Sequence, residues 1–384
     1  MLEDGLYVKP ILESPELSKS LQLERRDPQG CTLFLSACKS GLGADAPAEH
    51  TATDLRKLED HERYERPFIP DIYKGECLEQ PRIVLQYLLA LGVDPYATDY
   101  RGKNALHHLL EAHDVYHGYG WTPIVYQSLK YLVTQFRSLL RRPDNHGIYP
   151  LHAALMRIRR SLYSHTWTNC TALEDCVKIL VAAGADVHAR DGRGNTALHY
   201  LADTDLDVKS SQPERSNARR VLFYMFLTYG CTSDINVRNN LGKTPARLLL
   251  DDGGARQEWE KFETESQQNA KEAEAIDDQL LPIFDAAGAD WCEVDKSGRK
   301  LLHGVAAQKI ERALGRCQFL LQKGVNPLAC DIDGKTARDY ALHHNSTAVA
   351  RLLKAHEKLA VAGQEPVLNR NVVQVQPLGV ALIG

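Results

Sequence analysis

Polar turns and short apolar segments alternate along most of the chain. A turn that begins with Asp or Asn and has Gly three residues later occurs seven times, at 27–30, 99–102, 144–147, 191–194, 239–242, 295–298 and 331–334. A largely apolar segment follows each turn, as in GNTALHYLA at 194–202. This repetition predicts an array of similar helical units, because each unit has an apolar face that it can bury only against its neighbours.

A second apolar segment precedes four of these turns and ends in Gly, as in VKILVAAG at 177–184. The glycine lies seven residues before the Asp of the turn in each case, at Gly92, Gly184, Gly288 and Gly324. Glycine adopts the left-handed conformation that ends many helices. The two signals at a fixed offset predict two helices in each unit.

The residues of the turn have separate physical roles. Gly three residues after Asp suits a tight turn with positive φ, and the Asp side chain can accept bonds from nearby backbone N–H groups. Thr196 and Thr244 suit a helix N-cap, and Pro150 and Pro245 suit a first helical turn, where no N–H is needed.

In these motifs the chain resembles the ankyrin-repeat family, whose units place Asp-x-x-Gly-x-Thr-Pro-Leu-His-x-Ala in a turn and first helix, then end an apolar second helix in Gly-Ala-Asp. The resemblance covers about residues 27–356. It implies an all-α solenoid of six or seven helix-turn-helix units joined by β-turn or hairpin loops. Individual copies depart from the pattern, since Arg247 and Asp339 replace the histidine.

Three regions are expected: an N-terminal segment at 1–26, the array at 27–356 and an extended or disordered tail at 357–384. Successive turn glycines from Gly102 onward are 36 to 56 residues apart, against about 33 in ordinary ankyrin units, so insertions are expected. The insertion at 251–279 has ten acidic and three basic residues, which favours either a solvated excursion or an acidic docking segment. Residues 31–98 hold either a long loop or an extra degenerate unit.

Four histidines occupy one position of the repeat: His107, His152, His199 and His303. Repetition argues against catalysis, because an active site is needed once. The family resemblance implies that each ties its turn to a neighbour through hydrogen bonds.

Other candidate chemistry is sparse. The Gly-Lys-Thr sequences at 242–244 and 334–336 lack the earlier glycine of a nucleotide-binding loop. His108, His113 and His117 lie near a helix end without a Cys or a clear third ligand, so we expect solvated surface histidines, no metal and no cofactor. The alternative is an enzyme or metal-binding module whose site lies in an insertion near these three histidines and residues 44–77.

Composition and charge limit the classes of binding partner that we expect. A formal charge of −4 gives no reason to expect nucleic acid or an anionic membrane, and no small-molecule substrate is evident. Nine cysteines without a Cys-x-x-Cys pair predict reduced, mostly buried thiols. No segment has signal-peptide character or the length to cross a bilayer, so we expect an intracellular protein, cytoplasmic or nuclear.

The resemblance implies a non-catalytic adaptor or scaffold that binds another protein through its turn tips and concave first-helix surface. Tyr96 and Trp291 have an alternative role, packing on adjacent turns. The resemblance also makes Asn236 and Asn326 candidates for hydroxylation. The candidate contact residues are large or charged side chains at the tips: Tyr96, Tyr100, Arg101, Lys103, His146, Arg190, Arg193, Asn240, Trp291 and Lys296.

Overall fold

The computed structural model describes residues 23–39, 85–86, 88–111, 123–161, 170–202, 213–251, 280–308 and 313–362. They fall into two compact units that divide between Ala289 and Asp290. Regular structure in these residues is helical apart from two isolated bridges, Val294 with Lys300 and Cys330 with Thr336. The predicted all-α class is confirmed.

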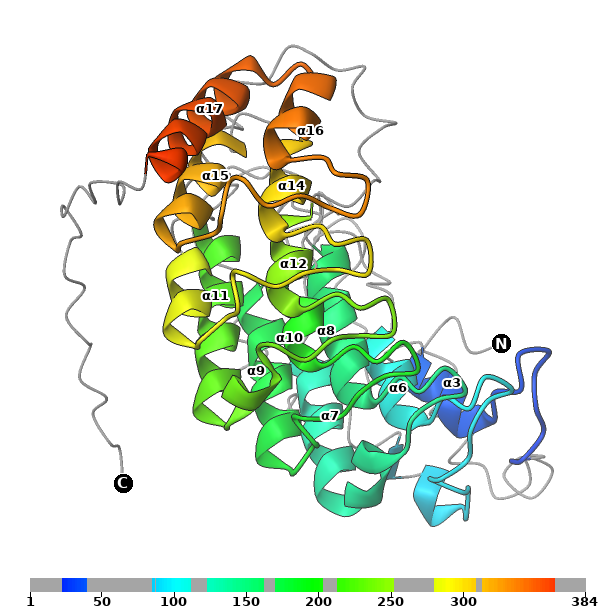
Figure 1. Cartoon of the computed structure of the whole chain (residues 1–384). Helices are drawn as coiled ribbons and strands as arrows, with labels where there is room; N and C mark the ends of the chain where they lie inside the picture. The colour runs from blue at the N-terminus through cyan, green and yellow to red at the C-terminus, as the bar shows by residue number, and fades with distance from the viewer. Residues whose placement is uncertain are drawn as a thin grey trace, which may run out of the picture. The chain divides into compact units, whose positions relative to one another are not determined.

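The first unit has two rows of helices (Figure 1). Neighbouring helices pack on one another within each row, and helices of the same repeat pack across the rows. The inner row consists of α3 (Leu33–Lys39), α6 (Ala105–Glu111), α8 (Pro150–Ser161), α10 (Ala197–Ala202) and α12 (Pro245–Leu250). The outer row contains α7 (Pro123–Gln135), α9 (Cys170–Ala182), α11 (Pro213–Thr228) and the helical residues at 280–286.

The second unit repeats this arrangement twice. The helices α14 (Leu301–Ala306) and α15 (Ala313–Gln322) form one pair, and α16 (Ala337–His343) and α17 (Thr347–Val361) form the next. The boundary expected at 356 falls inside α17, which continues to Val361. The buried residues of this helix, Val349, Ala350 and Leu353, all lie before the expected boundary, and its last turn continues past it.

Every turn motif has the geometry expected from its residues. In the turn at 191–194, Asp191 Oδ1 accepts the backbone N–H of Arg193 at 2.8 Å and of Asn195 at 2.7 Å, and Gly194 has φ +76°. The first residue of each of the other six turns accepts the same pair of N–H groups. The repeated motif therefore builds one turn conformation seven times.

The glycine spacing used above did not predict one helix end. Gly230 has φ +94° at the end of α11, but it lies nine residues before Asn239 instead of seven. A short 3-10 helix, η5 (Cys231–Asp234), fills the added length. Likewise, α7 is followed by the 3-10 helix η4 (Arg137–Arg141), which has no glycine to mark it.

Several predictions lie outside the described residues: those on His113 and His117, on residues 44–77, on most of the acidic insertion and on the tail beyond 362. The described cysteines are free thiols, and five of these seven are buried. Within the described part of the chain, no helix combines the length and apolarity needed to span a membrane.

Candidate functional site

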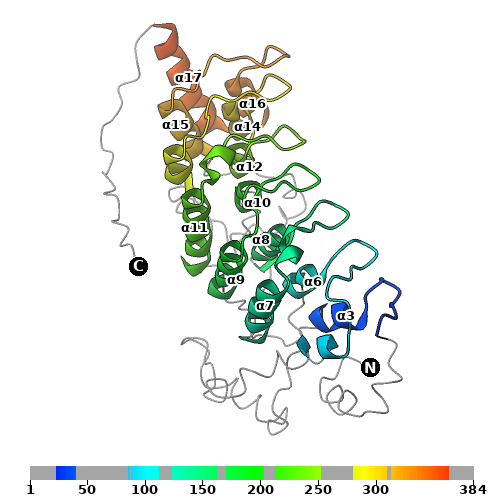
Figure 2. The same cartoon turned by 90° about the horizontal axis from the view of Figure 1, so that it is seen from below.

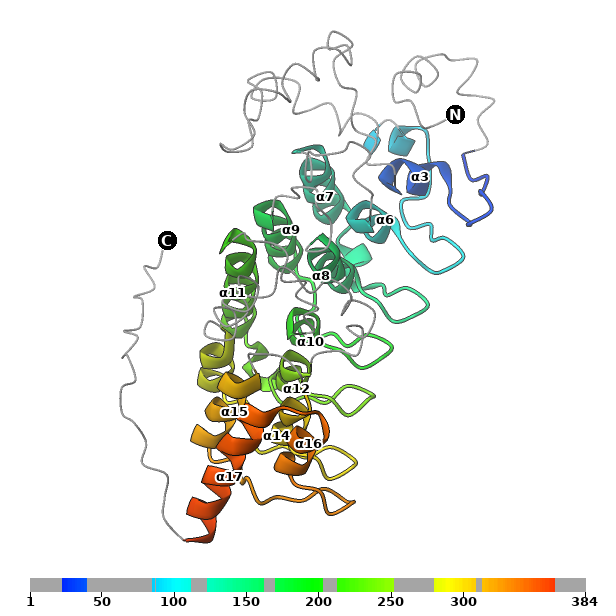
Figure 3. The ribbon, with the colours of Figure 1, turned by 90° about the horizontal axis from the view of Figure 1, so that it is seen from above.

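The turns of the first unit project beside the inner helices, where Figures 2 and 3 show them as successive loops. A backbone hydrogen bond joins each tip to the next one in the row. The N–H of Tyr100 donates to Gln29 O at 3.2 Å, and that of Asn145 donates to Arg101 O at 2.8 Å. The next two tips continue the series, with Gly192 donating to His146 O at 2.9 Å and Asn240 donating to Arg193 O at 2.9 Å. Five tips are thus held in register by their backbones.

Large side chains project from this series into solvent. Tyr100 is 65% exposed, and Arg101, His146 and Arg193 are also exposed. The carboxylates of the turns point inward to backbone N–H groups, so Arg101 and Arg193 give the exposed tips positive charge. We call the side chains of Tyr100, Arg101, His146 and Arg193 the tip surface.

Three other predicted contact residues take part in interactions within the chain. The Arg190 guanidinium donates to Arg238 O at 2.7 Å, and the Asn240 amide donates to Gly192 O at 3.1 Å. Lys103 forms an ion pair with Glu111. These side chains stabilise the turns that carry the tip surface.

Tyr96 and Trp291 show the packing role that was the alternative for both. Trp291 is only 5% exposed and lies edge-on to Phe319, with ring centroids 5.0 Å apart. Tyr96 is 38% exposed and lies edge-on to Phe136, with the Arg142 guanidinium over its ring. Trp291 therefore offers little surface to a partner.

The second unit has its own exposed tips. Lys296 is exposed there, and Ile332 is 74% exposed. Sequence reasoning missed Ile332 and also Leu241, which is 73% exposed at a tip of the first unit. Ile332 occupies the motif position of Tyr100, one residue after the first Asp of its turn, and Leu241 occupies that of Arg101, two residues after the first Asn. Position in the repeat would therefore have identified both residues.

The four repeated histidines link consecutive turns, as the resemblance implied. In each, Nε2 lies close to a backbone carbonyl of the following unit: Ile148 O at 2.8 Å from His107, Ala189 O at 3.2 Å from His152, Lys243 O at 3.1 Å from His199 and Ala329 O at 3.1 Å from His303. Their Nδ1 atoms accept the N–H of the residue three positions earlier. A neutral imidazole donates from one nitrogen only, so this pattern assigns the proton to Nε2 in His152, His199 and His303. His107 Nδ1 also lies 2.9 Å from Asn104 Oδ1.

The protonation state of these histidines follows from their surroundings. Burial is the largest influence on all four, and it lowers each pKa below the ordinary value of 6.5. Neutral imidazoles that both accept and donate serve as buried connectors, and none of the four reaches an open site.

His108 differs from the sequence expectation of a solvated histidine. It is buried on α6, with Nε2 3.3 Å from Asp99 Oδ2 and 3.8 Å from Cys31 Sγ. The expectation failed because Cys31 is 77 residues away in sequence and the motif gives no sign that the two residues meet.

The two asparagines considered for hydroxylation are both exposed. The Asn236 amide donates to Gly288 O at 2.9 Å, and Asn326 Oδ1 accepts the N–H of Leu328 at 2.9 Å. Their modification stays a prediction.

Comparison with known proteins agrees with this architecture. Residues 146–192, which include α8 and α9, match the family model described as Ankyrin repeat. The chain is also similar to the E3 ubiquitin-protein ligase KEG of Arabidopsis thaliana, with 24% identity over 246 residues. The match covers 64% of this chain and only 12% of that protein's length. The resemblance to ankyrin-repeat proteins is confirmed.

Proposed function

We propose that the protein is a non-catalytic adaptor that binds another protein at the tip surface and the adjoining inner helices. The observation that carries this proposal is the hydrogen-bonded series of tips, which presents Tyr100, Arg101, His146 and Arg193 on a backbone held in register. A preorganised surface loses little entropy when a partner binds. Tyrosine and arginine are also the side chains that contribute most strongly to protein interfaces.

The chemistry of the tip surface favours a partner with acidic groups beside an apolar side chain. Arg101 and Arg193 supply positive charge and Tyr100 supplies an exposed ring, and Leu241 at the neighbouring tip adds exposed aliphatic area. The ligase activity named for the plant relative is not part of this proposal, because the match covers 12% of that protein.

The test is affinity capture with a matched pair of variants. The tip variant carries Tyr100→Ala, Arg101→Ala and Arg193→Ala, and the control carries Tyr224→Ala and Tyr229→Ala at two outer-row tyrosines that are about half exposed. A protein recovered by the parent should bind the tip variant at least about tenfold more weakly in titration calorimetry and bind the control unchanged. Circular dichroism establishes that all three chains are folded.

Equal affinity of the parent and the tip variant would reject the tip surface as the binding site. Turnover of a small molecule that one point change abolishes in a folded chain would reject the non-catalytic function and favour the alternative of an insertion-borne enzyme.

A further inference from the structure

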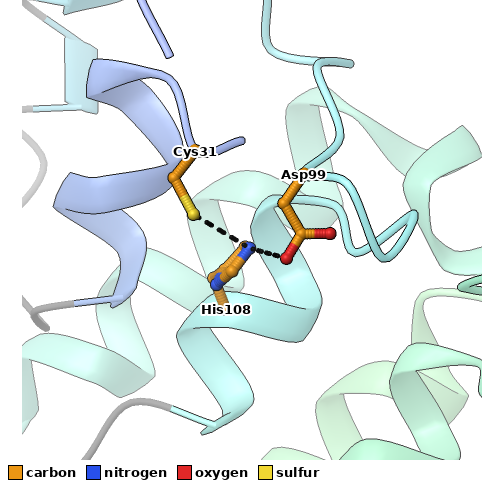
Figure 4. A group of neighbouring side chains, drawn as sticks. All are labelled: Cys31, Asp99 and His108. Carbon is orange, nitrogen blue, oxygen red and sulfur yellow. Dashed lines mark hydrogen bonds and ion pairs between the residues drawn. The ribbon is translucent and has the colours of Figure 1, made fainter. Parts of the chain in front are cut away.

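Cys31, Asp99 and His108 form a buried cluster where the first two inner helices meet (Figure 4). Cys31 lies just before α3, Asp99 begins a turn, and His108 lies on α6. Cys31 Sγ, Asp99 Oδ2 and His108 Nε2 all lie within 4.8 Å of one another. Sulfur, oxygen and nitrogen atoms suited to metal binding therefore converge from three segments.

In two other repeats, the residue at the position of His108 makes only a hydrogen bond to the Asp that begins its turn. Nine residues after the first Asp of the turn, Tyr200 and Tyr340 donate their hydroxyls to Asp191 Oδ2 and Asp331 Oδ2, both at 2.6 Å. His108 occupies the same position relative to Asp99, but its Nε2 remains 3.3 Å from the carboxylate. This distance exceeds the roughly 2.7–2.9 Å of a charge-assisted N–H···O bond.

A hydrogen-bonded catalytic relay does not fit the cluster. Such a relay engages the nucleophile at one ring nitrogen and the carboxylate at the other. Here Cys31 and Asp99 both approach Nε2 of His108, and one N–H cannot point at both.

Two of the three ligand-to-ligand separations fit a shared tetrahedral cation, and the third, between Cys31 Sγ and Asp99 Oδ2, is within 4.8 Å. Zinc lies about 2.0–2.1 Å from a histidine nitrogen, about 2.0–2.2 Å from a carboxylate oxygen and about 2.3 Å from a thiolate. At the tetrahedral angle, these lengths place nitrogen about 3.4 Å from oxygen and about 3.6 Å from sulfur. The corresponding distances in the cluster are 3.3 Å and 3.8 Å.

Neighbouring groups hold the ligands in place. Asp99 Oδ1 accepts the N–H groups of Arg101 and Lys103, both at 2.8 Å, which leaves Oδ2 directed at the cluster. The N–H of Cys31 donates to Asp27 Oδ1 at 2.8 Å. Two repeat turns thus hold two of the three ligand residues, and α6 carries the third.

We propose that Cys31, Asp99 and His108 bind one zinc ion, which joins the first repeat to the second. Binding displaces the thiol proton of Cys31 to solvent, and the neutral imidazole of His108 keeps its proton on Nδ1. One thiolate and one carboxylate then balance the two positive charges of the ion, so the buried site is neutral. In this proposal a water molecule is the fourth ligand. This proposal does not depend on the adaptor function.

A second cluster of the same residue types serves as an internal control. His188 Nδ1 lies 2.8 Å from Asp234 Oδ2, and the Cys231 thiol donates to Val187 O at 3.6 Å. His188 is also about half exposed. Here the polar groups are paired by ordinary hydrogen bonds, and we propose no metal.

The decisive variant is His108→Tyr. It introduces the side chain that the repeats of Asp191 and Asp331 have nine residues after that Asp, at Tyr200 and Tyr340. It can retain a hydrogen bond to Asp99 and the fold, but it removes the nitrogen ligand. Full-length protein without a histidine tag should contain one equivalent of zinc by elemental analysis, and cobalt should give a thiolate charge-transfer band. His108→Tyr and Cys31→Ala should lose the band and bind zinc at least about a hundredfold more weakly.

Cys231→Ala is the matched control and should retain full zinc content. The proposal is overturned if the parent shows neither zinc nor a cobalt–thiolate band, or if His108→Tyr binds zinc as tightly as the parent. Loss of zinc only in a His113→Ala, His117→Ala double variant would also overturn it, because the ion would then lie elsewhere.

Discussion

Each turn of the first unit has a buried side and an exposed tip, and the two differ in how freely their residues vary. On the buried side, His107, His152 and His199 repeat one set of contacts. At the tips, the residue two positions after the first residue of the turn is Arg101, His146, Arg193 or Leu241, and all four side chains are exposed. The comparison teaches that the repeated residues determine the scaffold, whereas the residues that change from turn to turn are the ones available for recognition.

Acid should produce the largest effect on the buried side, because the four histidines respond together. Their folded pKa values lie below 6.5, so the unfolded chain takes up protons first as pH falls. The free energy of unfolding should be greatest above about pH 6.5 and should decline as pH falls from there toward the folded pKa values. Urea unfolding at a series of pH values measures this, and a flat profile from pH 7 to 5 would contradict it.

A methyl group at the crowded turn of Gly147 should lower the free energy of unfolding more than the other single substitutions compared below. Gly147 has φ +73°, and an added Cβ would lie 2.4 Å from the backbone nitrogen of Gly192. Gly147→Ala should lower the free energy of unfolding by about 3 kcal/mol, from conformational strain plus the clash. Gly230→Ala has φ +94° but no atom within 4 Å, so it should cost only about 1 kcal/mol. Equal losses in urea unfolding would show that the tips are not closely packed.

Removing one buried histidine should lower the free energy of unfolding somewhat less than Gly147→Ala does. His199→Ala leaves Lys243 O without its donor and creates a cavity, so we expect a loss of about 2 kcal/mol in urea unfolding. His146→Ala at the exposed tip is the matched control and should change stability by less than about 0.5 kcal/mol. If the two substitutions have the same effect, the distinction between the buried side and the tips fails.

A single hydroxyl offers a finer test. Tyr200→Phe removes one of the two side-chain donors to Asp191 Oδ2, since Asn195 Nδ2 still donates at 3.0 Å, and should lower stability by about 1 kcal/mol, as judged from the thermal midpoint and urea unfolding. Because Asp191 Oδ1 keeps its two backbone donors, the turn itself should stay intact. A loss near that of Gly147→Ala would indicate that the hydroxyl, and not the backbone, holds the turn.

The sequence was sufficient for features that depend on local geometry. The turn glycines and the contacts of Asp191 follow from residues a few positions apart, so their conformation could be predicted. Gly230 was missed because η5 changed the offset on which the prediction relied. The burial of Trp291 depends on Phe319, and the cluster of His108 depends on Cys31. Such contacts between distant segments leave no periodic signal in one sequence.

The smallest effect on stability should come from the tip surface, where the effect on binding should be largest. Tyr100→Ala and Arg193→Ala should each change the free energy of unfolding by less than about 0.5 kcal/mol, because both side chains are exposed. Urea unfolding beside a binding titration separates the two effects. A large loss of stability would place these residues with the scaffold.

Site-specific photo-crosslinking tests the account most directly, because it reports which side chains contact the partner without altering the scaffold. A photoreactive phenylalanine analogue would replace Tyr100 in one chain and Tyr224, an exposed residue of α11, in another. The account predicts that the captured partner is crosslinked from position 100 and not from position 224. Crosslinking from position 224 alone would contradict it and would place recognition on the outer helices.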